Sequence, residues 1–333
     1  MTYSSFNPGK PWLDTEGKPI HAHGGSIITV NGVYYWYGEN KEKSTAGSGI
    51  WHWGVRCYSS TDLYNWKDLG IICPPNETDG DHPLHFTQYM DRPHIVYNEK
   101  TGKFVLWMKI MDKKSIIHQY MTICTADKIT GPYENLKTWE PDGFCSGDFD
   151  IVKDPKSGKA YIYFDALYGC SHKHIACFQL NDDYTAVVGE PTFHMSHPER
   201  FVGREAPCFF ERNGKKFMTV SQTTGYIPNP TECFESDDYH GEWKNLGRIH
   251  INDTELLSFR SQISSVFKIP DKDIYIAVAD RWLPNLQPDM PLNWVDIYDN
   301  AMNPESDGSL KPQFEEINNR NNYPPTRDTS IAR

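Results

Sequence analysis

Acidic residues stand just before apolar, strand-like segments at three well-separated points of the chain. Asp91 occurs in "MDRPHIV", Asp148 in "CSGDFDIV" and Glu205 in "GREAPCFF". Carboxyl groups serve as general acids and bases, and a pair of them can protonate a leaving oxygen while activating a water. Crowded acids raise one another's pKa, which keeps one of them protonated near neutral pH. These residues are therefore candidate acid–base groups, provided that the fold brings them together.

The segments that carry these acids belong to a repeat. Polar turns between two apolar strands recur at Asn31-Gly32, near Gly102, near Gly158, at Asn213-Gly214 and near Lys272, so successive turns are 70, 56, 56 and 58 residues apart. Asn-Gly and short Gly-containing loops are strong hairpin signals. Between the hairpins, "YSSTDLYNWKDLG" and "FESDDYHGEWKNLG" are similar to each other and are typical of the outer strands of four-stranded units. Repeated units of this kind, about 50 residues long, indicate propeller blades.

We therefore predict an all-β fold, a five-bladed β-propeller, with residues 1–333 forming a single domain. A β-sandwich with Greek-key connections is the alternative, but it would not explain the period. In a propeller the innermost strands converge on a central channel. The starts of these strands meet there although they are far apart in the sequence. The tail from Asn300 is expected to pack irregularly, with a closing strand at "SLKPQFEEI".

The same position in the first and fifth units carries other polar residues. The first unit has His21 and His23 in "HAHGGS", and the fifth has Arg260 and Gln262 in "FRSQISSV". We expect these side chains to join the three acids in the channel. Arg204, beside Glu205, is expected to turn outward or to hold another acid.

Composition excludes several classes of function. The chain of 333 residues has 14% aromatic residues, including 19 Tyr and 10 Trp, which suit sheets and sugar-stacking sites. The net charge of -11 argues against a nucleic-acid partner, which needs basic patches. No apolar run approaches the roughly 20 residues of a membrane span, so no membrane partner is expected. The N-terminus lacks the basic and apolar regions of a signal peptide, so the chain as written is predicted to be cytoplasmic, or secreted if a signal was removed.

Cysteine and histidine spacing gives little support for a metal. The eight cysteines form no CxxC pair and are expected to be buried thiols. The pairs His21-x-His23 and His172-x-His174 place two imidazoles on one strand face, which could hold a metal, but the pattern supplies no third ligand. We expect no metal there, and hydrogen bonding to a sugar or water by His23. With no GxGxxG motif after a strand and no P-loop, no redox or nucleotide cofactor is expected.

Several longer segments, in their order and spacing, resemble glycoside hydrolase family 43. The resemblance is carried by "AHGGSIITVNGVYYWYGENK", "DRPHIVYNEKTGKFVLWM", "SGDFDIVKDPKSGKAYIYF", "GREAPCFFERNGKKFMTVSQTTGYIPN" and "RSQISSVFKI", and it is strongest to the exo-β-1,3-galactanase branch. It implies a five-bladed propeller that cleaves an oligo- or polysaccharide with inversion. It implies that Glu205 is the general acid and that Asp148 orients this acid. The family also holds an ion in the channel in some members, so a structural cation there is a further expectation.

The general base is left open by the resemblance. The family's usual first-blade Asp is absent, since Ala22 and His23 stand there. In the galactanase branch the base is assigned to a second-blade Glu or to a fifth-blade Gln in an unusual tautomer. The corresponding residues here are Asp91, one methylene shorter, and Gln262. We expect these two residues to hold the attacking water.

Substrate contacts and rival activities complete the expectations. Sugar contacts are predicted for six residues, with Tyr37 or Trp282 as the stacking platform: His23, Tyr37, Glu39, Thr224, Arg281 and Trp282. An α-L-arabinofuranosidase, β-xylosidase or galactofuranosidase on the same scaffold is an alternative. A sugar-binding propeller without catalysis is another, but the retention of both Glu205 and Asp148 argues against it.

Overall fold

The computed structural model describes residues 2–6, 11–45, 47–113, 115–168, 171–197, 203–224, 227–282 and 296–302. These residues form antiparallel strands and two single-turn 3-10 helices, Pro141–Gly143 and Ser258–Arg260. The strands are β1 (His23–Val30), β2 (Val33–Glu39), β3 (Val55–Ser60), β4 (Lys67–Cys73), β5 (Tyr89–Asn98), β6 (Lys103–Asp112), β7 (Ser115–Ala126), β8 (Glu134–Trp139), β9 (Cys145–Lys153), β10 (Ala160–Tyr168), β11 (Ser171–Leu180), β12 (Val187–His194), β13 (Arg204–Arg212), β14 (Lys215–Gln222), β15 (Glu232–Ser236), β16 (Lys244–Arg248), β17 (Ser261–Lys268), β18 (Tyr275–Trp282) and β19 (Asp296–Met302). Within the described ranges, none of the helices has the length and apolar character needed to cross a membrane.

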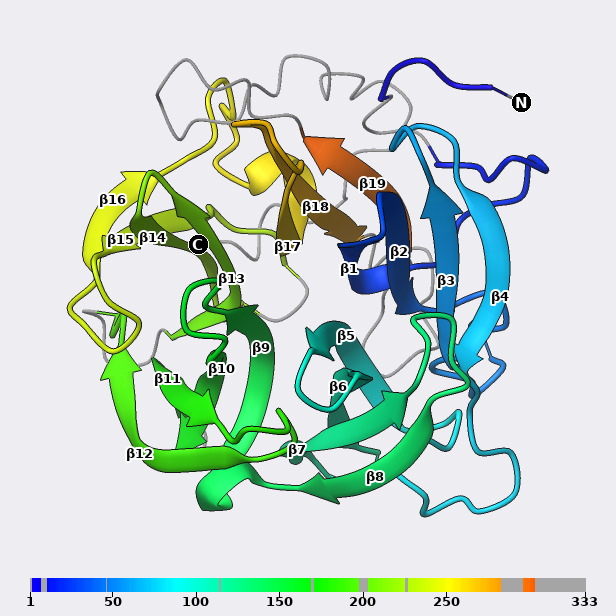
Figure 1. Ribbon diagram of the computed structural model, residues 1–333, viewed down its shortest axis with the longest axis horizontal. Helices are drawn as coiled ribbons and strands as arrows, with labels where there is room; N and C mark the ends of the chain where they lie inside the picture. Colours follow the sequence, from blue (N-terminus) through cyan, green and yellow to red (C-terminus); the bar gives the residue numbers. More distant parts are fainter. Residues whose placement is uncertain are drawn as a thin grey trace.

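The strands are arranged as sheets around a central axis (Figure 1). The first to fourth sheets are β1–β4, β5–β8, β9–β12 and β13–β16, and the fifth is β17–β19. The inner strands form a closed ring, because β1 contacts β5 and β17, β9 contacts β5 and β13, and β13 contacts β17. The predicted all-β propeller is therefore confirmed. Four blades are complete with four strands, whereas the fifth sheet has three strands in the described part of the chain, and the closing strand expected at "SLKPQFEEI" lies outside it.

The hairpin turns follow from local sequence as predicted. In the first sheet Asn31 and Gly32 have φ values of 50° and 77°, and in the fourth Asn213 and Gly214 have 52° and 76°. A two-residue turn with positive φ at both positions matches the right-handed twist of the flanking strands. Each turn fixes the register of its inner strand and therefore the position of the residues at the far end of that strand.

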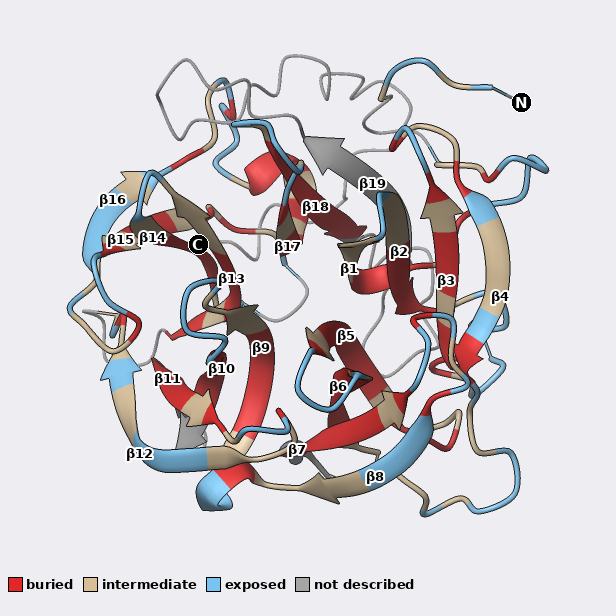
Figure 2. Cartoon of the chain, in the orientation of Figure 1, coloured by how far each residue is buried: buried red, intermediate tan, exposed pale blue. Residues whose placement is uncertain are grey.

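The hydrophobic core lies between neighbouring sheets. Figure 2 shows inner strands that are mostly buried and outer strands such as β4, β8, β12 and β16 with exposed positions. Between the second and third sheets, for example, Val96 and Trp107 pack in one cluster with Phe149 and Phe164. All seven described cysteines are free thiols and six of them are buried, as expected, while Cys170 lies outside the described residues.

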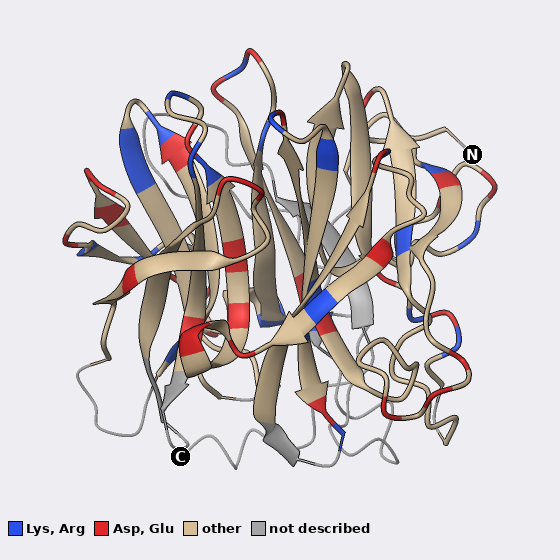
Figure 3. Ribbon diagram, turned by 60° about the horizontal axis from the view of Figure 1, so that its bottom comes forward, with Lys and Arg blue, Asp and Glu red and all other residues tan. Residues whose placement is uncertain are grey.

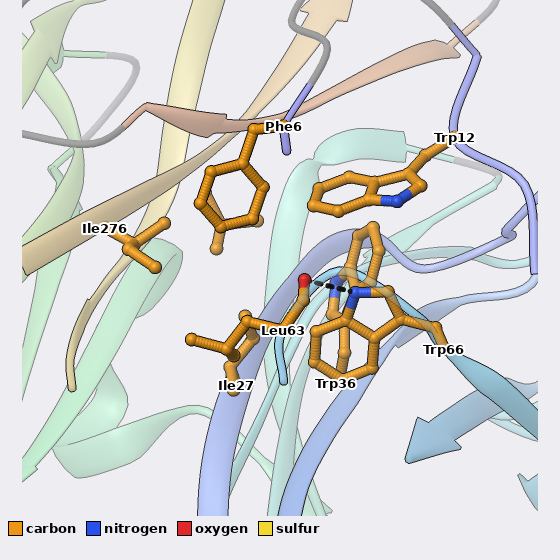
Figure 4. A pocket seen from close by; sticks show the side chains of 8 residues that line it. Phe6, Trp12, Ile27, Trp36, Leu63, Trp66 and Ile276 are labelled. Carbon is orange, nitrogen blue, oxygen red and sulfur yellow. Dashed lines mark hydrogen bonds between the residues drawn. The ribbon is translucent and has the colours of Figure 1, made fainter. Parts of the chain in front are cut away.

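The ring closes between the first and fifth sheets, where an N-terminal segment covers the seam (Figure 4). A small apolar pocket there is lined by Trp36 and Trp66 on one side and Ile276 on the other, with Phe6 and Trp12 over it. The ring centroids of Phe6 and Trp12 are 5.6 Å apart, and those of Trp12 and Trp36 are 5.3 Å apart. The segment thus adds aromatic packing across the junction of the first and last sheets.

Every inner strand is irregular near its start. In four inner strands the register shifts within the strand itself: between His23 and Ser26 in β1, Asp91 and His94 in β5, Glu205 and Cys208 in β13, and Ile263 and Ser265 in β17. For β9, the shift in its pairing with β10 lies between Phe164 and Ala166 of β10. β-Bulges of this kind are common beside active sites, where they redirect a side chain. In β1, β5 and β13 the residue after the site position takes a positive φ, namely Gly24 at 59°, Arg92 at 51° and Ala206 at 53°. The irregularity therefore coincides with the positions that the sequence picks out as candidate site residues.

Asp150 ties the third sheet to the fourth from inside the core. Its Oδ2 accepts a hydrogen bond from the Phe209 N–H (2.7 Å) and its Oδ1 accepts one from the Ile151 N–H (2.8 Å). Burial raises the pKa of this carboxyl to about 7, against the effect of these hydrogen bonds. Asp150 is thus a structural residue, and its titration is linked to folding.

We expect stability to fall with rising pH through this group. The folded protein keeps the Asp150 proton up to about pH 7, whereas the unfolded chain releases it near pH 3.9. The contribution of Asp150 is therefore fully present below about pH 4 and is lost as the pH rises to about 7. Thermal unfolding followed across this window should show a smaller decrease in Tm for Asp150→Asn than for the unmodified protein. Parallel Tm profiles would contradict the assignment.

Candidate functional site

A continuous chain of polar contacts joins residues from the starts of four inner strands. Glu205 Oε1 accepts from Gln262 Nε2 (3.2 Å), Gln262 Oε1 accepts from Arg92 (2.5 Å), and Arg92 Nε lies 3.1 Å from Asp148 Oδ2. Lys109 Nζ then bridges Asp148 Oδ1 (2.6 Å) and Asp91 Oδ2 (3.1 Å). The residues come from β13, β17, β5, β9 and β6. The predicted meeting of Glu205, Asp148, Asp91 and Gln262 in one place is what the geometry shows.

Two buried cations hold the acids together. Burial alone would lower the pKa of Lys109, but the charges of Asp148 and Asp91 outweigh it and raise this pKa above its usual range. Burial likewise opposes the charge on Arg92, yet the surrounding acids, Asp148 first among them, raise its pKa. Both side chains therefore stay charged. In Figure 3 most charged residues lie on loops and outer segments, while a few lie within the strands of the interior.

Glu205 is the half-buried acid of the group. Its neighbour Arg204 points elsewhere, because its Nε lies 2.9 Å from Glu232 Oε2 and its Nη1 donates to the Met195 carbonyl (2.8 Å). The prediction that Arg204 holds another acid is confirmed. Glu205 is therefore left to contact Gln262, whose Nε2 also donates to Ser221 Oγ (2.8 Å).

A second group of polar residues lies at the start of the first sheet. His23 Nδ1 is 3.2 Å from Asp280 Oδ2, and His23 Nε2 is 3.6 Å from Glu39 Oε1. Lys41 Nζ lies 2.8 Å from Glu39 Oε2. Burial raises the pKa of Glu39 to about 8, even though the charge of Lys41 favours the ionised form. The start of β1 thus carries a buried histidine, His23, next to the carboxyl groups of Glu39 and Asp280.

These groups do not fit a calcium ion. One atom each from His23, Glu39 and Asp91 lie within 4.8 Å of one another, which is the only such cluster among the described residues. Calcium takes six to eight oxygen ligands, and here the carboxyl groups of Glu39 and Asp91 already face the ammonium groups of Lys41 and Lys109. We therefore derive no step through a cation at this position.

Several predicted sugar contacts are placed away from any open surface. The prediction that Tyr37 is a stacking platform is wrong, because its ring is 2% exposed within the core and its hydroxyl accepts from the Ile95 N–H (2.8 Å). His23 and Glu39 lie near Asp91 but are 2% and 0% exposed. Both side chains are therefore buried and offer almost no exposed surface to a sugar.

The other predicted positions differ in exposure. Thr224 is exposed in the loop after β14, where its Oγ1 donates to the Ile227 carbonyl (2.6 Å). Arg281 is buried and its Nη2 donates to the Phe259 carbonyl (3.2 Å). The side chain of Trp282 lies outside the described residues.

Two further residues expected in the channel lie outside it. Arg260 Nε is 3.2 Å from Glu255 Oε2 near the surface, so this prediction is wrong. The electrostatic neighbours of His21 are Glu42, Arg56 and Asp68, away from the three acids, so His21 does not join them either. Arg260 belongs to the 3-10 turn Ser258–Arg260 that precedes the strand carrying Gln262, so it does not share the geometry of the strand start.

Sequence reasoning missed the two cations at the centre of the site. Lys109 is a lone charge inside the apolar run "FVLWMKIM", and a charge in a buried strand requires a partner. That signal could have identified it. Arg92 directly follows Asp91, but the positive φ that turns it toward Asp148 and Gln262 has no evident sequence marker.

Comparisons with known proteins agree with this architecture. The family description "Glycosyl hydrolases family 43" matches residues 18–283. The chain therefore belongs to glycosyl hydrolase family 43. No match is found among curated proteins.

Solved structures with related folds include galactose-specific enzymes. The chain is similar to a family 43 β-1,3-galactosidase, BT0265, with 28% identity and a TM-score of 0.82 over 95% of this chain and 63% of that one. It is similar to the exo-β-1,3-galactanase Pc1,3Gal43A from Phanerochaete chrysosporium, with 26% identity and a TM-score of 0.78 over 93% and 66%. An exo-β-1,3-galactanase from Clostridium thermocellum has 26% identity and a TM-score of 0.71 over 89% and 65%. The chain thus spans less than two thirds of the length of these three proteins.

The buried ion pairs predict a strong effect of removing Lys109. We expect Lys109→Met to lower the free energy of unfolding by about 3–5 kcal/mol at neutral pH, because it leaves the buried Asp91 without its cation and Asp148 with Arg92 alone. Chemical denaturation measures this value. Lys103→Met is the matched control, since Lys103 is on the same strand and its ion pair with Asp127 is solvent-exposed. This control should cost at most about 1 kcal/mol, and equal losses would show that Lys109 is not a buried counter-charge.

Proposed function

We propose that the protein is an inverting, exo-acting glycoside hydrolase that removes terminal β-1,3-linked galactose from galactan or arabinogalactan. The observation that carries this proposal is the chain of contacts from Glu205 through Gln262, Arg92 and Asp148 to Lys109 and Asp91. It brings together in one site the half-buried carboxyl group of Glu205 and the buried carboxylates of Asp91 and Asp148, which are paired with cations. The galactosidases and galactanases with similar folds support galactose as the sugar.

Glu205 is assigned as the general acid and Asp148 as the residue that orients the site around it. Acid catalysis requires a carboxyl group that can reach the leaving oxygen, and among the three central acids Glu205 is the one classed as half-buried. Asp148 contacts both Arg92 and Lys109, and Arg92 in turn contacts Gln262. Asp148 is therefore linked to Glu205 through Arg92 and Gln262.

The attacking water requires a base on the opposite side of the sugar. Inverting enzymes separate acid and base by about 6.5–9.5 Å to admit this water. Asp91 and Gln262 are the two candidates. Thr224 and Arg281 are proposed to bind sugar hydroxyls near the mouths of β14 and β18, and Trp282 to offer a stacking face. His23 and Glu39 are proposed to support this surface from behind.

The scaffold is proposed to be a five-bladed propeller that acts as one catalytic domain over residues 1–333. The three-stranded sheet supports this reading, because β17 contacts both β1 and β13 and so occupies the place of a blade in the ring. The family match over residues 18–283 covers all five sheets up to β18.

Replacing the acid tests the assignment directly. Glu205→Gln should lower kcat on β-1,3-galactobiose by about 100-fold or more, because the amide cannot donate the proton, while substrate binding survives. Steady-state kinetics and calorimetric binding measure the two effects. Glu211→Gln, on the same strand at its other end, is the control and should behave like the unmodified protein. An unchanged rate for Glu205→Gln would show that the acid is misassigned.

A substrate panel distinguishes the proposal from its rivals. Nitrophenyl α-L-arabinofuranoside, β-xyloside and galactofuranoside, tested beside β-1,3-galactobiose, identify the preferred sugar. Proton NMR of the first product should show α-galactose if cleavage proceeds with inversion. Binding of galactan, arabinan and xylan oligomers without cleavage of any would instead favour a sugar-binding protein.

We also propose that no cation or other cofactor is required for activity. Lys41 and Lys109 supply positive charge next to Glu39 and Asp91, where an ion would otherwise compensate these acids. Galactobiose hydrolysis should therefore be unchanged after dialysis against EDTA and in the presence of added Ca²⁺. A loss of activity that Ca²⁺ restores would contradict this proposal.

A further inference from the structure

All the polar groups of the Gln262 side chain have partners. Its Oε1 accepts from Arg92 Nη2 (2.5 Å), and its Nε2 lies 3.2 Å from Glu205 Oε1 and 2.8 Å from Ser221 Oγ. The guanidinium of Arg92 has two further contacts. Its Nε lies 3.1 Å from Asp148 Oδ2, and its Nη1 donates to the Ile263 carbonyl (3.3 Å). Gln262 is therefore held by a rigid, buried donor rather than by solvent.

Because the donor to Oε1 is Arg92, only one tautomer of the Gln262 side chain fits this site. A guanidinium only donates hydrogen bonds and never accepts them. Oε1 facing Arg92 must therefore be an acceptor, which is the carbonyl of the ordinary amide. The imidic tautomer would place an O–H against Arg92, where it has nothing to donate to. In the amide form Nε2 carries two protons, one for Glu205 and one for Ser221, and it has no lone pair available for a proton from water.

The position of Gln262 also disfavours a role as base. Its Nε2 is 3.2 Å from Glu205, the proposed acid. Inversion requires the base to lie about 6.5–9.5 Å from the acid, on the other side of the sugar. A residue in hydrogen-bond contact with the acid belongs to the acid's side of the site.

Asp91 has an oxygen that can accept a proton from water, which Gln262 lacks. Its Oδ2 lies 3.1 Å from Lys109 Nζ, whereas its Oδ1 is buried and has no hydrogen-bond partner among the described residues. A buried acceptor without a partner is costly, and an ordered water commonly supplies the missing donor. A water held at Asp91 Oδ1 would be placed to give its proton to this oxygen.

We propose that Arg92 is a positioning residue that locks Gln262 as an amide donor to Glu205, so that the role of general base falls to Asp91. This inference rests on the proposed function. In the reaction, the water oxygen forms the new bond to the anomeric carbon while the bond to the leaving oxygen breaks. The Glu205 proton goes to the leaving oxygen and one water proton goes to Asp91. Gln262 exchanges no proton and keeps Glu205 Oε1 as an acceptor, which leaves Oε2 to carry the acid's proton.

Azide rescue separates the two candidate bases. Azide is a nucleophile that needs no base, so it restores activity when the base alone is missing. With a nitrophenyl β-galactoside as substrate, we expect azide to raise kcat of Asp91→Ala by about 10-fold or more and to give α-galactosyl azide. Gln262→Ala should show no rescue, with the unmodified protein as the control for inhibition by azide. Rescue of Gln262→Ala but not of Asp91→Ala would overturn the proposal.

Coupling between Arg92 and Gln262 tests the positioning role. If Arg92 acts through Gln262, the losses in kcat/KM caused by Arg92→Met and Gln262→Ala should be less than multiplicative in the double variant, by a factor of about 3 or more. Independent, multiplicative losses would show that Arg92 acts through Asp148 alone. A purely structural role for Arg92 would lower Tm without producing this coupling in kcat/KM.

A measurement without catalysis keeps this inference separate from the proposed function. In protein labelled with ¹⁵N-glutamine, the Gln262 side-chain signal is the one lost in Gln262→Ala or, if that variant does not fold, in Gln262→Met. We expect this nitrogen to carry two protons. A nitrogen with one proton would reveal the imidic form and overturn the inference, even if the protein cleaves no galactoside. If the nitrogen carries two protons but no galactoside is cleaved, the tautomer inference stands and the galactosidase proposal fails.

Discussion

The site depends on the burial of two cations among its acids. A carboxylate placed in a protein interior costs several kcal/mol unless a partner and hydrogen bonds compensate it. Lys109 and Arg92 provide this compensation for Asp91 and Asp148 within 2.6–3.1 Å. Both cations belong to the second sheet, while Asp148 belongs to the third. The charges are balanced only when neighbouring sheets have assembled, so formation of the site and closure of the ring are coupled.

Circular packing gives the site its precision. Each inner strand contacts the next, and the N-terminal aromatic residues Phe6 and Trp12 cover the junction of the first and fifth sheets. The bulges then turn the polar residues at the strand starts away from the regular alternation. A one-residue change of register at any strand start would move its side chain to the other face. The hairpin turns at the other ends of these strands, such as Asn31-Gly32, prevent such a change of register.

Local signals in the sequence were enough to predict the sheets and the shared position of the three acids. They were not enough to predict which side chains contact one another between sheets. Asn-Gly turns and the period act within one unit, and the three acids share a position in that unit, so both could be predicted. Tyr37 was misplaced because a tyrosine in a strand can face the core or the channel, and only packing against Ile95 and its neighbours decides. Arg92 and Lys109 were missed because their contacts with Asp148 and Gln262 cross to other sheets, over separations of 39 residues and more.

The same network explains why the start of the inner strand β1 carries His23 and not an acid. His23 there lies between Asp280 and Glu39, and burial raises the pKa of Glu39 to about 8, so Glu39 adds little negative charge at neutral pH. A further ionised carboxylate beside them would have no cation of its own, since Lys41 and Lys109 already face Glu39 and Asp91. A base is therefore accommodated more easily on the second sheet, next to Lys109. In the proposed mechanism, Asp91 is one methylene shorter than Glu and so leaves more room for the water between its carboxylate and the sugar.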